Sequence, residues 1–507
     1  MTCCLPSRSG GDDAPGDGCP AGAGAGAGPP GDAGEPGAGL AVPATWRALL
    51  EELAPVFQRR STHTLFIALA CGMILASRRT VVAMAAAAGM AARFRRACWF
   101  FSHAVWDVDD LGLAVARLIV KHLLAEGEPV TVAVDGTFFR RWGKKVAQAR
   151  WAYDGSAQGG KKIAFGNTWV IAAIVVRLPA CSSPVALPVL FRLWRGKGTA
   201  SQVGLAAQMI ATLTAAFPGR LIHGVGDAAF HGQALLCEGA TWTTRLPASA
   251  ALYGLRPAPT GRRGRPRKKG HRLGTPPEIA RKRDTSWQAV TVRIYGKTRT
   301  MQAAVTGALW HGSFKDAPGW LVLVRDPGSR QPYDLALFTL DLAATAAAVI
   351  ERYSWRWPIE PSNATGKQIL GVGEACNRLE AAVERTVPFG FLVQTLLICW
   401  YARSGYDPAD IGLRRLLCPW YRTKHEPAVA DMLAKLRREF LKARFSAIRP
   451  GRGCRITAEC GWRSEIWIRR RFWTTLSSTR GFRRWTRVSA SCRASFEWPG
   501  GLCRAAC

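Results

Sequence analysis

Two aspartates at the ends of strand-like runs, followed by a set of spaced polar residues, most constrain the fold of this chain. Asp135 closes the β-branched run 132–135, and Asp227 closes the apolar run 221–227. A fold that brought these segments and a later glutamate together would make a three-carboxylate site for divalent metal. The later residues follow the spacing Y-x2-R-x3-E-x6-K: Tyr353, Arg356, Glu360 and Lys367.

Each part of this pattern has a purely structural alternative. An aspartate at a strand end is often a turn or cap residue, and Tyr, Arg, Glu and Lys on one helix often form only a solvated ion-pair face. Pro358 and Pro361 predict that one helix ends before Pro358 and a second begins there, with proline in its first turn. The second helix would direct its positive end at a phosphate. Both aspartates upstream of this spacing favour a functional site.

The pattern resembles the DDE transposases of bacterial insertion sequences, in the group that carries the YREK signature. The resemblance covers roughly residues 45–405 and implies an α/β fold. In it, an RNase-H-like mixed-sheet core carries a β-rich insertion and follows an N-terminal helical domain. The resemblance implies that Asp135, Asp227 and Glu360 are catalytic. They would hold two Mg²⁺ ions about 3.5–4 Å apart, and Mn²⁺ could replace them. The other signature residues would bind DNA phosphates: Tyr353, Arg356 and Lys367.

The resemblance also implies the reaction and the partners. Water would cut one strand at the transposon end, and the freed 3′-OH would attack target DNA. The partners would be DNA, as terminal inverted repeats and as target, and a second copy of the chain in a homodimer on DNA. Two alternatives remain open here: an RNase-H-like nuclease without strand transfer, and an inactive or repurposed DNA-binding remnant.

The charge of the chain indicates the same kind of partner. It has 69 basic and 35 acidic side chains, a formal net charge of +34, which favours a polyanion as partner. Thr64–Ala76 is too short to cross a bilayer, and Thr386–Ala402 carries a proline and a glutamine. We therefore expect a cytoplasmic, nucleoid-associated protein with neither a membrane nor a small-molecule substrate.

Two basic segments are candidate DNA contacts. Residues 262–272 hold seven Lys or Arg in eleven positions, and residues 263–266 resemble the core of an AT-hook, which lies in a narrow minor groove. A flexible loop that attracts phosphates without selecting sequence is the alternative. A second group follows the first aspartate at 140–150 and would line a DNA channel or form the charged face of a hairpin. The residues predicted to bind DNA are Arg263, Arg265, Arg267, Lys268, Lys269, Lys144 and Lys145.

Composition and periodicity predict the order of domains. The segment 1–43 is rich in glycine and proline and is expected to be disordered. The segment 451–507 is rich in Arg, Trp and Cys, as in a frame-shifted translation, although a basic nucleic-acid tail would also be Arg-rich. Between them we expect a helical DNA-binding or structural layer at 44–125, the first part of the core at 126–240, the β-rich insertion with its basic loop at 241–340, the second part of the core at 341–405 and a C-terminal helical region at 406–450.

Individual elements follow from the same patterns. Apolar spacing predicts helices from Trp46 to Leu124, with breaks near Ser77 and Gly89 and a cap at Asp107. A buried helical region is expected to break at Pro388. The remaining predictions are strands at 129–139, 166–178 and 221–230, a helix at 200–217, a helix at 341–355 that leads into the signature, and the buried helical region at 380–403.

Overall fold

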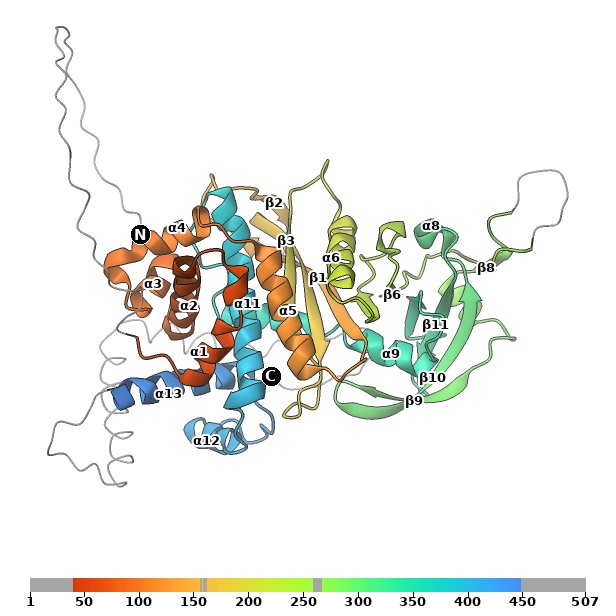
Figure 1. Ribbon diagram of the computed structural model, residues 1–507. Coiled ribbons are helices and arrows are strands. Elements are labelled where there is room, and N and C mark those ends of the chain that lie inside the picture. The colour runs from red at the N-terminus through yellow and green to blue at the C-terminus, as the bar shows by residue number, and fades with distance from the viewer. Residues whose placement is uncertain (1–39, 156, 158–161, 259–266, 448–507) are drawn as a thin grey trace, which may run out of the picture. The chain divides into compact units, whose positions relative to one another are not determined.

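The computed structural model describes residues 40–155, 157, 162–258 and 267–447, and Figure 1 shows their arrangement. The chain divides into two compact units, Met1–Ala443 and Arg444–Cys507. The predicted disorder of residues 1–39 and the predicted frame-shifted tail fall outside the described residues.

A mixed sheet of ten strands forms the centre of the first unit. Its order is β2-β3-β1-β5-β6-β12-β11-β10-β9, with β4 paired to β3. Strand β1 pairs antiparallel with β3 and parallel with β5, and β5 pairs parallel with β6. This RNase-H-like core confirms the predicted α/β class. Its strands are β1 (Val130–Arg140), β2 (Arg150–Tyr153), β3 (Ile163–Val176), β4 (Val185–Trp194), β5 (Ile222–Gly226) and β6 (Ala240–Arg245).

The β-rich region after Asp227 extends the core sheet instead of forming a sheet of its own. Strand β12 pairs antiparallel with β6, and β11, β10 and β9 continue outward from it. These strands are β9 (Gln288–Ile294), β10 (Lys297–Ala308), β11 (Gly319–Arg325) and β12 (Leu335–Thr339). A separate pair, β7 (Leu252–Tyr253) and β8 (Arg272–Gly274), flanks the basic loop. Arg263 and Arg265 fall outside the described residues.

The N-terminal helices end where the sequence predicts. Helix α2 stops at Leu75, before Ser77, and Gly89 has a positive φ of 75° after α3. The Asp107 side chain accepts hydrogen bonds from the backbone N–H groups of Asp109 and Asp110 and so caps α5. The helices are α1 (Ala44–Glu51), α2 (Arg60–Leu75), α3 (Val81–Ala87), α4 (Phe94–Ser102) and α5 (Val108–Leu123).

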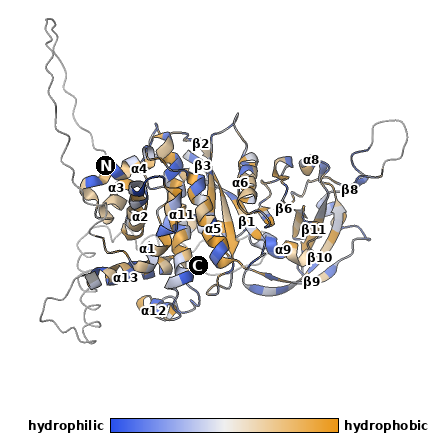
Figure 2. Cartoon of the chain, viewed as in Figure 1, coloured by the Kyte–Doolittle hydropathy of each residue, from blue (hydrophilic) through white to orange (hydrophobic). Residues whose placement is uncertain are grey.

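Helix α11 (Glu380–Trp400) is the central apolar helix, and the predicted break at Pro388 is wrong. Proline removes one backbone hydrogen bond at a cost of about 3 kcal/mol. The helix is nevertheless continuous because it is buried from Thr386 onward, and Phe389 packs edge-on against Phe66 and Phe101. With its last turn, α11 is long and apolar enough to cross a membrane, yet 89% of its most apolar window is buried inside the protein. Figure 2 shows apolar residues concentrated in this helix and the central strands.

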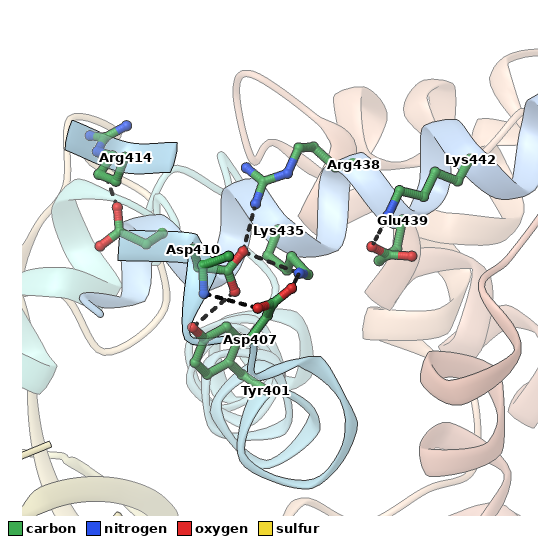
Figure 3. Close-up of polar contacts among 10 residues, drawn as sticks. Tyr401, Asp407, Asp410, Arg414, Lys435, Arg438, Glu439 and Lys442 are labelled. Carbon is green, nitrogen blue, oxygen red and sulfur yellow. Dashed lines mark hydrogen bonds and ion pairs between the residues drawn. The ribbon is translucent and has the colours of Figure 1, made fainter. Parts of the chain in front are cut away.

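Two C-terminal helices, α12 (Ala409–Leu417) and α13 (Val429–Ala447), are joined by buried charge. Asp410 in the first turn of α12 accepts hydrogen bonds from Lys435 at 3.1 Å and Arg438 at 3.2 Å, both on α13. The hydroxyl of Tyr401 donates to the same carboxylate at 3.2 Å. Figure 3 shows Lys435 and Arg438 converging on Asp410. This network fixes α13 against the end of the central helix.

Candidate active site

Asp135 and Asp227 lie level on neighbouring strands. In the parallel pair β1 and β5, Ala133 is opposite Val225, and the same register carried two residues further sets Asp135 opposite Asp227. Adjacent strands lie about 4.8 Å apart, and level residues of parallel strands project from the same face. The fold thus brings together the two aspartates that the sequence singled out.

The aspartates project from the face of the sheet that the start of α10 covers. Helix α6 (Gln202–Ala216) lies on the other face, where a Cβ on Gly136 would come within 3.2 Å of Gln202 Oε1. The small residues two before each aspartate, Ala133 and Val225, share a buried cluster with Ile359. Small side chains here let the first residue of α10 approach the sheet closely.

Glu360 follows Ile359 in the first turn of α10 (Ile359–Gln368). The preceding helix, α9 (Ala346–Ser354), has already ended, and Pro358 is the N-cap of α10. The predicted restart of the helix at Pro358 is therefore confirmed. The Glu360 carboxylate lies 2.8 Å from the guanidinium of Arg356.

Both other acids affect the pKa of the Asp135 carboxyl group. Burial, the charge of Asp227 and the charge of Glu360 together raise its pKa to about 7, and Arg356 opposes the shift. Carboxylates that share a site destabilise each other's ionised forms. Three acids from distant segments thus repel one another here, and a bound cation would relieve that repulsion.

The predicted metal site would take its ligands from Asp135, Asp227 and Glu360. Among the residues that the structure describes, no three acidic, histidine or cysteine side chains form a ready-made metal cluster. Glu360 is ion-paired with Arg356. All three candidate donors are carboxylate oxygens, which suit hard cations such as Mg²⁺ and Mn²⁺. The three residues fit such an ion if the Glu360 carboxylate leaves Arg356 and binds the ion instead.

Tyr353 and Arg356 flank the acids. Burial raises the pKa of Tyr353, and Asp227 adds to the rise, while the cations Arg356 and Arg245 oppose it. A hydrogen bond also joins the Tyr353 hydroxyl to Arg356. A phenol and a guanidinium are therefore gathered beside the carboxylates.

With this geometry established, the chain was compared with known families. Residues 52–300 match the DDE superfamily endonucleases. The matched DDE endonuclease domain contains Asp135 and Asp227 and ends before Tyr353, so the YREK group depends on the signature residues alone. No curated protein matches this chain. The match to this family indicates DNA as the substrate, and endonucleases of this kind generally use divalent metal.

Lys367, the last signature residue, fastens α10 to the first strand of the DDE endonuclease domain. Its Nζ donates a hydrogen bond to the Phe138 carbonyl at 2.9 Å and lies 4.9 Å from the centroid of the Phe139 ring. Burial lowers the pKa of Lys367, whereas the charges of Asp154 and Asp135 raise it. In this structure its ammonium group contacts β1 and lies within electrostatic reach of Asp135.

Sequence reasoning missed Arg245, which ends β6. Gly226 pairs with Thr244 in the parallel pair β5 and β6, so the next residues, Asp227 and Arg245, are level. The nearby charge of Arg245 lowers the pKa of Tyr353. The available signal was a cation at the end of the third parallel strand, but its use required knowing the strand order.

A buried ion pair beside the signature residues was also missed. Arg352 lies 2.8 Å from Asp341, and both side chains are almost inaccessible. His223 of β5 is hydrogen-bonded to Thr241 at 2.7 Å and lies 4.0 Å from Asp341. Burial and Arg352 lower the pKa of His223 to about 4, so the imidazole is neutral. The pair anchors α9 one residue before Tyr353.

The predicted DNA contacts that the structure describes are largely exposed. Lys144, Lys145, Arg267 and Lys268 are exposed, and Lys269 lies 3.7 Å from the centroid of the Tyr253 ring. The other basic residues of 140–150 are more varied. Arg141 is buried and donates to Asn167 and to the carbonyls of Gly373 and Ala375, so it serves the fold of the DDE endonuclease domain.

Proposed function

We propose that this protein is a DDE transposase of the YREK group. It would cut DNA at the ends of its own element and join the freed 3′ ends to target DNA. One observation carries the proposal: the charges of Asp227 and Glu360, which lie far from Asp135 in the chain, both raise the pKa of Asp135. The match to DDE superfamily endonucleases over residues 52–300 supports it.

The three acids are positioned by different elements and would therefore have different roles. Asp135 and Asp227 are fixed by the parallel register of β1 and β5 and would hold the cation from the sheet side. Glu360 is placed by a helix start and would close the site from above. When bound, two Mg²⁺ ions would supply activation of the attacking oxygen and stabilisation of the leaving oxygen.

Arg356 is the residue best placed to sense a phosphate. It contacts Glu360 at 2.8 Å and is also hydrogen-bonded to Tyr353. A guanidinium binds phosphate oxygens through paired, charge-assisted hydrogen bonds. We propose that a DNA phosphate binds Arg356 and displaces Glu360 from it. The Glu360 carboxylate then becomes free to bind metal only when substrate is present.

The reaction consists of two in-line displacements at phosphorus. Water attacks first and the 3′ oxygen leaves, and that 3′-OH then attacks a phosphodiester of target DNA. Tyr353, Arg356 and Lys367 would hold non-bridging oxygens of the scissile phosphate. The protein would act as a homodimer on paired terminal inverted repeats, in association with the nucleoid.

The test is a strand-transfer reaction with Mg²⁺, DNA that carries the element's own ends, and supercoiled target DNA. We expect cutting at the ends and covalent joining to the target. Cutting without joining would assign the protein to the RNase-H-like nucleases, and binding without cutting would assign it to DNA-binding remnants. Asp135→Asn should abolish cutting and spare DNA binding, and retained cutting would falsify the site.

A further inference from the structure

A basic, aromatic groove of about 520 Å³ lies at the end of the strand that carries Asp135. Trp142 and Trp151 line it and are 92% and 72% exposed. Lys144 and Arg140, the latter ion-paired with Asp154 at 2.6 Å, line it as well, and none of the described lining residues is acidic. Tryptophan is rarely this exposed without a partner, and the pairing of indole rings with cations is typical of nucleic-acid surfaces.

Strand pairing puts Trp151, which lines the groove, on the same face of the sheet as Asp135. Asp135 is opposite Ile171 in β3, and Phe165 of β3 is opposite Trp151 of β2. Paired residues of antiparallel strands share a face, as do residues an even number apart along β3. Trp151 therefore projects from the carboxylate face, and Tyr153, two residues further on β2, does so too.

The groove lies within reach of a DNA strand held at the carboxylates. Arg140 is five residues beyond Asp135 on β1, which is about 17 Å along the strand. That length corresponds to about five nucleotides of DNA at 3.4 Å per nucleotide. A strand that leaves the cutting site along β1 would therefore reach the groove.

From these observations we infer that the groove binds unpaired bases of a DNA strand, which stack on Trp151 and Trp142 while Lys144 contacts the backbone. This inference rests on the proposed function for the position of the strand. Bases within a duplex are already stacked and cannot reach the indole faces, whereas single-stranded bases gain from aromatic stacking.

The exposed charge of the lining favours an anionic occupant. Arg141 also lines the groove, but it is only 7% exposed and its guanidinium is held by Asn167 and by the carbonyls of Gly373 and Ala375. Lys144, which is exposed, is therefore the lining cation that a DNA phosphate can reach. A second copy of this chain would bring further cations to a groove whose described lining residues include no acid to pair with them.

The test compares the affinity of two DNA probes by fluorescence anisotropy in EDTA, so that no catalysis is needed. One probe is a blunt duplex, and the other is the same duplex with a thymidine extension of about five nucleotides. We expect the wild-type protein to bind the extended probe about tenfold more tightly, as stacking of one or two bases gives. Trp151→Ala should remove this preference and leave the affinity for the blunt duplex unchanged.

Two variants serve as controls. Trp151→Phe keeps a stacking surface and should retain most of the preference. Trp420→Ala removes an indole of equal exposure, 72%, elsewhere in the chain and should retain all of it. Because Trp151 is exposed, its truncation leaves the core intact.

The inference is overturned if the wild type binds both probes equally, if Trp151→Ala keeps the preference, or if that variant instead abolishes self-association in sedimentation. These failures are separate from failure of the proposed function, which is measured by cutting in Mg²⁺. If the protein cuts DNA but shows no preference for the extended probe, only the inference about the groove is refuted. If it shows the preference but does not cut, only the transposase assignment is refuted.

Discussion

The guanidinium of Arg356 lies 2.8 Å from the carboxylate of Glu360, one helical turn later in the chain. This contact neutralises the third acid of the site, whereas Asp135 is buried beside it with a raised pKa. The site therefore has a closed form, in which the cation of the protein itself occupies Glu360. Phosphate binding by Arg356 provides a route to the metal-binding form.

Replacement of Arg356 by glutamine should separate metal binding from catalysis. Without the guanidinium, Glu360 is free and the site is more negative, so Mn²⁺ should bind as tightly as in the wild type or up to about tenfold more tightly. Cutting should fall by about 10²–10³-fold, because a cation that stabilises the transferred phosphoryl group is gone. Calorimetric titration with Mn²⁺ and a cleavage assay measure the two effects.

The matched control is Arg330→Gln, which removes an exposed cation elsewhere and should change neither quantity. Weaker Mn²⁺ binding by Arg356→Gln would contradict the closed form.

The raised pKa of Asp135, about 7 against 3.8 for an isolated side chain, predicts how stability depends on pH. Between about pH 4 and pH 7 the folded protein keeps a proton at Asp135 that the unfolded chain has released. Stability should therefore decline as the pH rises through this window. Relative to Asp135→Asn, the wild type should lose about 2–4 kcal/mol of unfolding free energy.

Urea unfolding in EDTA at the two ends of this window measures the loss. Added Mg²⁺ should restore stability to the wild type at high pH and leave Asp135→Asn unchanged. Parallel pH profiles for the two proteins would show that Asp135 is not perturbed.

The buried pair of Arg352 and Asp341 should contribute strongly to the placement of α9. Arg352→Met leaves the Asp341 carboxylate buried without its cation and should cost about 3 kcal/mol of stability. The double variant Arg352→Met with Asp341→Asn should recover part of that loss. Arg195→Met, which breaks partly exposed pairs with Glu380 and Glu384, should cost less than about 1 kcal/mol. Equal losses in urea unfolding would refute a special role for Arg352.

The basic segment before β8 should determine part of the salt dependence of DNA binding. Changing Arg267, Lys268 and Lys269 to glutamine removes up to three phosphate contacts. The slope of log affinity against log salt should become shallower by about 1–3, since each neutralised phosphate contributes about 0.9. Anisotropy titrations over a salt series measure the slope, and an unchanged slope would exclude these residues as phosphate contacts.

Local patterns predicted much of the core. The β-branched run before Asp135 became β1, the apolar spacing at 200–217 became α6 (Gln202–Ala216), and proline chemistry located the start of α10 at Ile359. Each of these features depends on residues that are close in the chain. The pairing of the two aspartates followed from both lying at strand ends.

Non-local features could not be predicted in the same way. Arg245 enters the site only because β6 is the third parallel strand, and Arg141 is buried only because the segment around Gly373 folds over it. Proline at 388 was expected to break its helix, but dense packing on every side of α11 outweighs one lost hydrogen bond. Register, strand order and packing decide such cases, and a single sequence does not display them.

Replacing Mg²⁺ by Fe²⁺ tests most directly whether Asp135, Asp227 and Glu360 share one metal site. With ascorbate and peroxide, a bound Fe²⁺ ion generates hydroxyl radicals that cut the polypeptide beside its ligands, and mass spectrometry locates the cuts. We expect cuts near Asp135, Asp227 and Glu360. Excess Mg²⁺ and Asp135→Asn should suppress all of them, but Asp284→Asn, which alters an exposed acid elsewhere, should not. Cuts near only one of these residues, or cuts that persist in Asp135→Asn, would contradict a shared metal site.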